Sequence, residues 1–129
     1  GKAGTRGDII DGRFTGTGKG KLLLISHMDT VYSRGQLAET PWRVADGKAY
    51  GPGIADDKSG IAVILSTLKL LKPADYGQIT VAFNTDEEIG SLGSGDIITE
   101  LARGQSAVLS FDLTITHTTH GMLDGTSGT

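Results

Sequence analysis

The chain has 129 residues, of which 37% are hydrophobic and 21% charged, and its formal net charge is −3 at pH 7. This balance is typical of a globular domain, and it leaves no basic surface for nucleic acid or for an acidic membrane. The sequence contains no cysteine, which excludes disulfides, thiolate metal ligands and a thiol nucleophile. No apolar run approaches the roughly 20 residues of a membrane span. No signal peptide is visible, so the compartment stays open between cytoplasm and periplasm.

The first predicted elements are two strands on either side of a glycine-rich turn. Residues 8–15 include a short alternation of apolar and polar side chains, which favours a strand. Residues 22–26 form a continuous apolar run, which predicts a strand buried on both faces of a parallel or mixed sheet. The turn at residues 16–21 fails the spacing of a phosphate loop and precedes a strand, whereas a phosphate loop follows one. Nucleotide binding is therefore the weakest of the alternatives.

His27 and Asp29 follow the buried strand directly. In open α/β sheets, ligands bind at the carboxyl ends of the strands, so His27 is placed where chemistry would occur. Residues two apart in extended backbone point the same way, and Asp29 can therefore accept the second ring N–H of His27. Such a partner is usual beside a metal-bound imidazole. A single histidine in this position is nevertheless more often a structural residue than a ligand.

The segment from Gly51 to Gly60 combines glycines, a proline and two adjacent acids immediately before a predicted helix. Asp56 and Asp57 either form a plain helix cap, or comprise a carboxylate directed at a metal followed by the cap. Asp57 or Ser59 can cap the helix. The helix itself is predicted over residues 58–72 from one apolar stripe and ends before a proline. The stripe contains Ile61, Ile64, Leu65, Leu68 and Leu71.

The segments on either side of this helix are predicted from turns and from alternation. Residues 32–49 are expected to be mostly irregular, apart from a small hairpin around the Asp-Gly turn at 46–47. Residues 78–84 alternate and predict a strand, and residues 107–111 predict another. Between them, residues 96–102 predict a short helix with its apolar side chains inward. These side chains are Ile97, Ile98 and Leu101.

Acidic residues follow both of the later strands. Asp86, Glu87 and Glu88 come after residues 78–84, and Asp112 comes directly after residues 107–111. A solvated turn is one interpretation of the three consecutive acids, and a buried cluster that requires a cation is the other. Carboxyl ends of parallel strands meet at one edge of a sheet, where these acids would join His27 and Asp56. The sequence therefore predicts a metal site with nitrogen and oxygen ligands, which suits zinc or another divalent ion.

Four segments together resemble the family of zinc-dependent exopeptidases and deacylases. This family includes glutamate carboxypeptidase of the carboxypeptidase G type, acetylornithine deacetylase, succinyl-diaminopimelate desuccinylase and aminoacylase. The segments are Ser26-His27-Met28-Asp29-Thr30-Val31, Gly51-Pro52-Gly53-Ile54-Ala55-Asp56-Asp57-Lys58-Ser59-Gly60, Asn84-Thr85-Asp86-Glu87-Glu88-Ile89-Gly90-Ser91 and Leu109-Ser110-Phe111-Asp112. The sequences of these segments are most similar to the glutamate carboxypeptidase branch. The implied fold is α/β, with a mixed, mostly parallel sheet flanked by helices.

The resemblance implies a ligand set for two zinc ions. His27 and Asp112 would bind the first zinc, and Glu88 the second. Asp56 would bridge both ions from a turn that contains a cis peptide between Asp56 and Asp57.

The resemblance also implies the reaction, the hydrolysis of an amide bond. Zinc lowers the pKa of water and polarises the scissile carbonyl. Glu87 would be the general base that takes the proton from water and delivers it to the leaving amine, while Asp29 would orient His27. Adjacent Glu87 and Glu88 point apart in extended backbone, so that one can bind metal while the other stays free.

Several family features lack a counterpart, so residues 1–129 are expected to form a partial catalytic domain. The C-terminal half, which supplies one more histidine to the second zinc, and the lid or dimerisation domain are expected to be absent. The expected substrate is a small peptide or an N-acyl amino acid, from which C-terminal glutamate or a related N-acyl amino acid would be released. The activity of this chain alone is expected to be doubtful, and the second zinc ion is expected to bind weakly. Self-association through exposed apolar surface is a further expectation, and nucleic-acid and membrane partners are not expected. The alternative is a non-catalytic metal-binding α/β scaffold. His117 and His120 are expected in an exposed loop, with substitution for the missing ligand as the less favoured interpretation.

Overall fold

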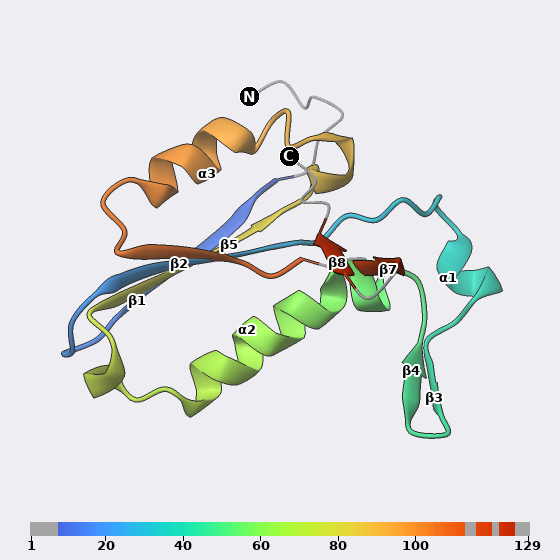
Figure 1. The fold of residues 1–129 in the computed structure, drawn as a ribbon, viewed down its shortest axis with the longest axis horizontal. Coiled ribbons are helices and arrows are strands. Elements are labelled where there is room, and N and C mark those ends of the chain that lie inside the picture. The colour runs from blue at the N-terminus through green and yellow to red at the C-terminus, as the bar shows by residue number, and fades with distance from the viewer. Residues whose placement is uncertain (1–7, 113–115, 120–121, 126–129) are drawn as a thin grey trace.

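The computed structural model describes residues 8–112, 116–119 and 122–125, and its centre is a four-stranded sheet between two helices (Figure 1). The strand order is β1-β5-β2-β6. β2 runs parallel to both of its neighbours, whereas β1 pairs with β5 in antiparallel orientation. The prediction of a mixed, mostly parallel sheet is therefore confirmed. The strands are β1 (Ile10–Thr15), β2 (Lys21–His27), β5 (Gln78–Asn84) and β6 (Ala107–Ser110).

The two longer helices cover opposite faces of this sheet (Figure 1). α2 (Ser59–Leu70) buries Ile64 against Leu24, Ile79 and Val81. These four side chains form the core on that face, and the apolar run in β2 accounts for its central place in the sheet. The predicted helix over residues 58–72 is confirmed with slightly shorter bounds.

α3 (Gly95–Ala102) covers the other face, but the prediction of its inward-facing side chains was wrong for one residue. Ile98 and Leu101 are half-buried as predicted, whereas Ile97 is 45% exposed. The buried position one turn before Ile98 is Ser94. Positions 94, 98 and 101 thus form the stripe that faces the sheet, and residue 97 lies about 100° around the helix from residue 98.

The region between β2 and α2 contains a small hairpin that projects away from the sheet (Figure 1). β3 (Arg43–Ala45) pairs with β4 (Lys48–Tyr50) in antiparallel orientation. Asp46 and Gly47 connect them with φ angles of 51° and 71°, the left-handed pair that a two-residue turn of type I′ requires. The predicted hairpin is confirmed. A one-turn helix, α1 (Gln36–Glu39), precedes it in a segment that was expected to be irregular, because four residues are too few to show helical periodicity.

Short elements complete the described chain. They are η1 (Ile54–Lys58), η2 (Pro73–Asp75), η3 (Glu87–Ile89), β7 (Thr116–Thr119) and β8 (Met122–Gly125). β7 and β8 pair in antiparallel orientation, with His117 opposite Asp124. The expectation of a loop is therefore wrong for His117, whose backbone belongs to a strand, and His120 lies outside the described residues. Within the described part of the chain, no helix is long and apolar enough to cross a membrane.

Ile79→Ala is expected to lower the free energy of unfolding by about 2–5 kcal/mol, because it removes buried methyl groups and leaves a cavity. Ile79 is fully buried between the sheet and α2. Urea unfolding followed by circular dichroism measures the change. Val63→Ala is the matched control, since Val63 is half exposed on α2 and a surface change shifts stability by about 0.5 kcal/mol or less. Equal losses in the two variants would contradict this placement of the core.

Candidate metal centre

Three neighbouring strands bring their carboxyl ends to one edge of the sheet. β2 ends at His27, and the segments that follow β5 and β6 carry Glu87, Glu88 and Asp112. Backbone hydrogen bonds continue the pairing past the strand ends, from the Met28 N–H to the Asn84 carbonyl at 2.8 Å. The parallel arrangement predicted from the sequence therefore places all these side chains around one point.

His27 is the centre of this arrangement. The residue is 2% exposed, and its Nε2 lies 2.8 Å from Asp56 Oδ1, 3.7 Å from Asp112 Oδ1 and 3.9 Å from Glu87 Oε2. Its other ring nitrogen, Nδ1, lies 3.2 Å from Asp29 Oδ1. One buried imidazole nitrogen surrounded by three carboxylates is a donor set that suits a divalent cation.

Among the residues that the structure describes, two groups of side chains have the spacing of metal ligands. His27, Glu87 and Asp112 form one, and His27, Asp56 and Glu88 form the other. Within each group, one ligand atom per residue lies within 4.8 Å of the others. The structure thus brings together all four ligands predicted from the sequence. The grouping differs from the expected one, because Asp56 and Asp112 fall in separate groups and Glu87 accompanies Asp112.

Extended backbone was predicted at Glu87 and Glu88, but both residues belong to the single 3₁₀ turn η3. Successive residues of a 3₁₀ helix are about 120° apart. The two side chains therefore still diverge, and each faces a different group.

The surrounding carboxylates shift the protonation of both central residues. Burial alone would lower the pKa of His27, but the hydrogen bond with Asp56 and the negative charges of Asp29 and Glu87 outweigh it and raise the pKa. The pKa of Glu87 is also raised, first by burial and then by the charges of neighbouring acids, against the opposing effect of His27. This concentration of negative charge around a buried histidine is what a bound cation would offset.

The turn that carries Asp56 is fixed to the end of β2 by its neighbour Asp57. The peptide between Asp56 and Asp57 is cis, as the resemblance implies. The carboxylate of Asp57 is almost fully buried and accepts hydrogen bonds from Ser26 Oγ at 2.5 Å and from the His27 N–H at 3.3 Å. It also accepts the Gly60 N–H at 3.3 Å, but the N-cap position of α2 is Lys58, without a side-chain cap, rather than Asp57 or Ser59 as predicted. Ser59, the other cap considered, donates its hydroxyl to the Ala55 carbonyl.

Asp29 has a second contact that sequence reasoning missed. Its Oδ2 accepts the backbone N–H of Glu88 at 3.0 Å. The carboxylate thus lies between His27 and the turn with the two glutamates and connects them. Residues 59 positions apart meet here, and the sequence contains no local signal for such a contact.

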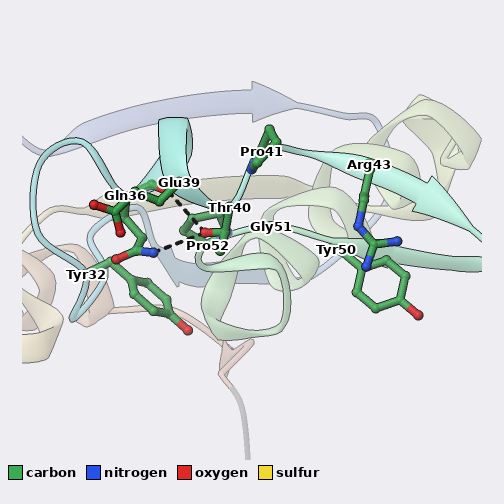
Figure 2. A pocket seen from close by; sticks show the side chains of 9 residues that line it. All are labelled: Tyr32, Gln36, Glu39, Thr40, Pro41, Arg43, Tyr50, Gly51 and Pro52. Atoms are coloured by element: carbon green, nitrogen blue, oxygen red, sulfur yellow. Dashed lines mark hydrogen bonds between the residues drawn. The ribbon is translucent and has the colours of Figure 1, made fainter.

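A pair of hollows adjoins the centre on the side of the hairpin. The nearer hollow has a volume of about 380 Å³, and Asp56 and Glu88 lie in its wall. A larger one of about 490 Å³ shares Tyr32, Tyr50 and Gly51 with it. Figure 2 shows the Arg43 guanidinium against the Tyr50 ring, 3.8 Å from its centroid, with Tyr32 and Gln36 in another part of the wall. The sequence did not identify Tyr32, Gln36 or Arg43 as part of the site.

Gly60→Ala is expected to destabilise the chain by about 1–3 kcal/mol through overpacking. A Cβ at Gly60 would lie 2.5 Å from Asp57 Oδ1 and 2.6 Å from the Phe111 carbonyl. Thermal unfolding checks this. The control is Gly95→Ala, where a Cβ meets nothing within 4 Å and a helical alanine gains up to about 1 kcal/mol. A stable Gly60→Ala variant would contradict the close approach of the turn to the end of β6.

The fold and this cluster define an α/β protein with a histidine and carboxylate centre at the carboxyl ends of its strands. The sequence profile of peptidase family M20/M25/M40 matches residues 23–126. The chain therefore belongs to this family of peptidases.

Individual relatives agree with this assignment. Carboxypeptidase G2 of Pseudomonas sp. (strain RS-16) is 62% identical over 111 residues, which cover 84% of this chain and 27% of that protein. Acetylornithine deacetylase of Shigella sonnei (strain Ss046) is 39% identical over 88 residues, which cover 61% of this chain and 22% of that protein. Peptidase T of Salmonella paratyphi C (strain RKS4594) is 53% identical over 38 residues, which cover 28% of this chain and 9% of that protein. The chain thus spans about a quarter of the length of the first two relatives.

Proposed function

We propose that this chain forms part of the catalytic domain of a zinc-dependent amide hydrolase, a carboxypeptidase that releases C-terminal glutamate or a related N-acyl amino acid. The observation that carries the proposal is the buried His27 Nε2 with Asp56, Asp112 and Glu87 around it. The similarity to a protein named carboxypeptidase G2 supports the reaction class.

The proposed ligands are four of the five residues in the two groups around His27, divided between the ions as the family resemblance implies rather than as the two groups are. His27, Asp56 and Asp112 would hold one zinc ion, and Asp56 and Glu88 would hold the second more weakly. Their nitrogen and oxygen atoms match the ligands that catalytic zinc takes in proteins. When bound, zinc polarises a substrate carbonyl and makes water more acidic.

The remaining steps belong to the side chains of this chain. Glu87 would take a proton from the attacking water and pass it to the leaving amine. Asp29 would hold the imidazole of His27 through Nδ1, so that Nε2 stays directed at the cluster.

The substrate would approach through the hollow beside Asp56 and Glu88. Residues that read its C-terminal carboxylate are proposed to lie in the parts of such enzymes that this chain does not span. The coverage of 27% of carboxypeptidase G2 supports this division.

Hydrolysis of an N-acyl glutamate tests the proposal. The zinc-loaded chain is expected to release glutamate faster than the same chain stripped with a chelator, and added zinc should restore the rate. A chain that binds zinc but hydrolyses at the background rate would favour the non-catalytic metal-binding scaffold and contradict the catalytic assignment.

A further inference from the structure

We propose that Asp86 is a positioning residue, whose buried carboxylate fixes the turn that carries Glu87 and Glu88 and thereby sets where they stand beside His27. The inference rests on the proposed function, because it concerns the same site. It differs from both interpretations of the three consecutive acids in the sequence, a solvated turn and a buried cluster that needs a cation.

The carboxylate of Asp86 has a hydrogen-bond donor for each of its oxygens. Oδ2 accepts the backbone N–H groups of Gly93 at 2.6 Å and Ser94 at 3.0 Å. Oδ1 accepts the Ser94 hydroxyl at 2.5 Å and a longer contact of 3.5 Å from Asn84 Nδ2. The residue is 2% exposed, so these neutral donors replace water around a charged group.

These donors also explain how the charge is tolerated without a cation. Both oxygens of the Asp86 carboxylate accept hydrogen bonds. The two groups with metal-ligand spacing among the described residues contain Glu87 and Glu88 but not Asp86. Asp86 therefore has a role other than that of a ligand.

The contacts of Asp86 close the segment 86–94 into a loop. The carboxylate binds the end of this segment, and the Asp86 carbonyl accepts the Ser91 N–H at 2.7 Å. Glu87 and Glu88 lie inside the closed loop. From the opposite side, Asp29 accepts the Glu88 N–H. The turn is thus held at two points, and Asp86 supplies the one that connects it to α3.

Asn84 connects the same network to the strands. Its Nδ2 donates to Ser94 Oγ at 3.1 Å, and its carbonyl accepts the Met28 N–H at 2.8 Å. In the register of the sheet, Asn84 lies opposite His27. The network therefore connects the turn that carries the two glutamates to the strand end that carries the histidine.

The test compares Asp86→Asn with the wild-type chain in two measurements. Affinity for the second zinc ion, which Glu88 on this turn would help to hold, is expected to fall by about 10-fold or more in competition with a chromogenic chelator, the loss typical of partners behind metal ligands. Amide hydrogen exchange of the zinc-free chain is expected to be faster at Glu88 and Gly90, whose N–H groups are bonded within and beside this turn.

Two further variants make the test decisive. Asp75→Asn is the matched control, because Asp75 also accepts a backbone N–H, from Lys72 at 2.7 Å, but lies before β5, at the other end of that strand from the site. Its zinc affinity should stay within about twofold of wild type. Ser94→Ala removes one donor and leaves Asp86 in place, and we expect a smaller, several-fold loss. If Asp86→Asn fails to fold, the zinc affinity of Ser94→Ala decides.

The proposal is overturned if the folded Asp86→Asn variant binds the second zinc ion within twofold of wild type, even if its exchange is faster, because Asp86 would then be merely structural. An unchanged zinc affinity in Ser94→Ala has the same meaning if Asp86→Asn does not fold. A wild-type chain that binds no zinc would instead overturn the proposed function. The exchange comparison would then still decide whether Asp86 holds the turn.

Discussion

Glu87→Gln is expected to lower the zinc-dependent hydrolysis of an N-acyl glutamate by about 10²–10⁴-fold, the usual contribution of a general acid or base. Glutamine keeps the size of the side chain and an oxygen atom at this position, but it cannot take a proton from water. Steady-state rates of the zinc-loaded chains measure the effect. Zinc content is expected to stay near the wild-type value, because the proposed ligands, which are His27, Asp56, Asp112 and Glu88, are unchanged.

The control for this variant is Glu100→Gln. Glu100 lies on α3 and pairs with Arg103 at 2.9 Å on an exposed surface, so its replacement should leave the rate unchanged. Equal rates for Glu87→Gln and the wild-type chain, both above background, would show that another group takes the proton. The assignment of Glu87 as the base would then be withdrawn.

His27→Ala is expected to lower metal binding more than Glu88→Ala or Asp112→Ala, because His27 belongs to both groups with the spacing of metal ligands and would supply the nitrogen ligand of the first zinc ion. Its zinc affinity should fall by more than the about 10–100-fold that outer partners of metal ligands cause. Glu88→Ala and Asp112→Ala each remove a member of one group and should cause smaller losses. Competition with a chelator measures all three affinities.

Circular dichroism of the zinc-free variants separates loss of a ligand from loss of the fold, since His27 is buried at the end of β2. A folded His27→Ala variant that binds zinc as tightly as the wild-type chain would place the metal elsewhere. Equal and complete losses for all three variants would instead indicate one shared site rather than two groups.

The sheet and the helix beside the site were predictable because their signals are local. The continuous apolar run predicted β2, the alternation of apolar and polar residues predicted β5, and the apolar residues at helical spacing predicted α2. The acids after the strands could be placed together because parallel strands share an edge. The cis peptide at Asp56 and Asp57 followed from the family resemblance rather than from any pattern in the residues.

The remaining features depend on contacts between distant residues. The antiparallel placement of β1 at the edge beside β5 is set by tertiary pairing. In the sequence, Asp29 and Asp86 are recognised only as parts of metal-binding or acidic motifs. In the structure, Asp29 accepts the Glu88 N–H, and Asp86 accepts the Ser94 N–H at the start of α3. Local spacing identifies a carboxylate but not the donors that the fold brings to it.

Crystals of the zinc-soaked wild-type chain test the central claim most directly, through an anomalous difference map collected at the zinc absorption edge. We predict a peak about 2.0–2.1 Å from His27 Nε2, with oxygen atoms of Asp56 and Asp112 around it. A second, weaker peak is expected beside Asp56 and Glu88. A fully soaked crystal with no peak at His27, or with zinc bound only away from this cluster, would contradict the account.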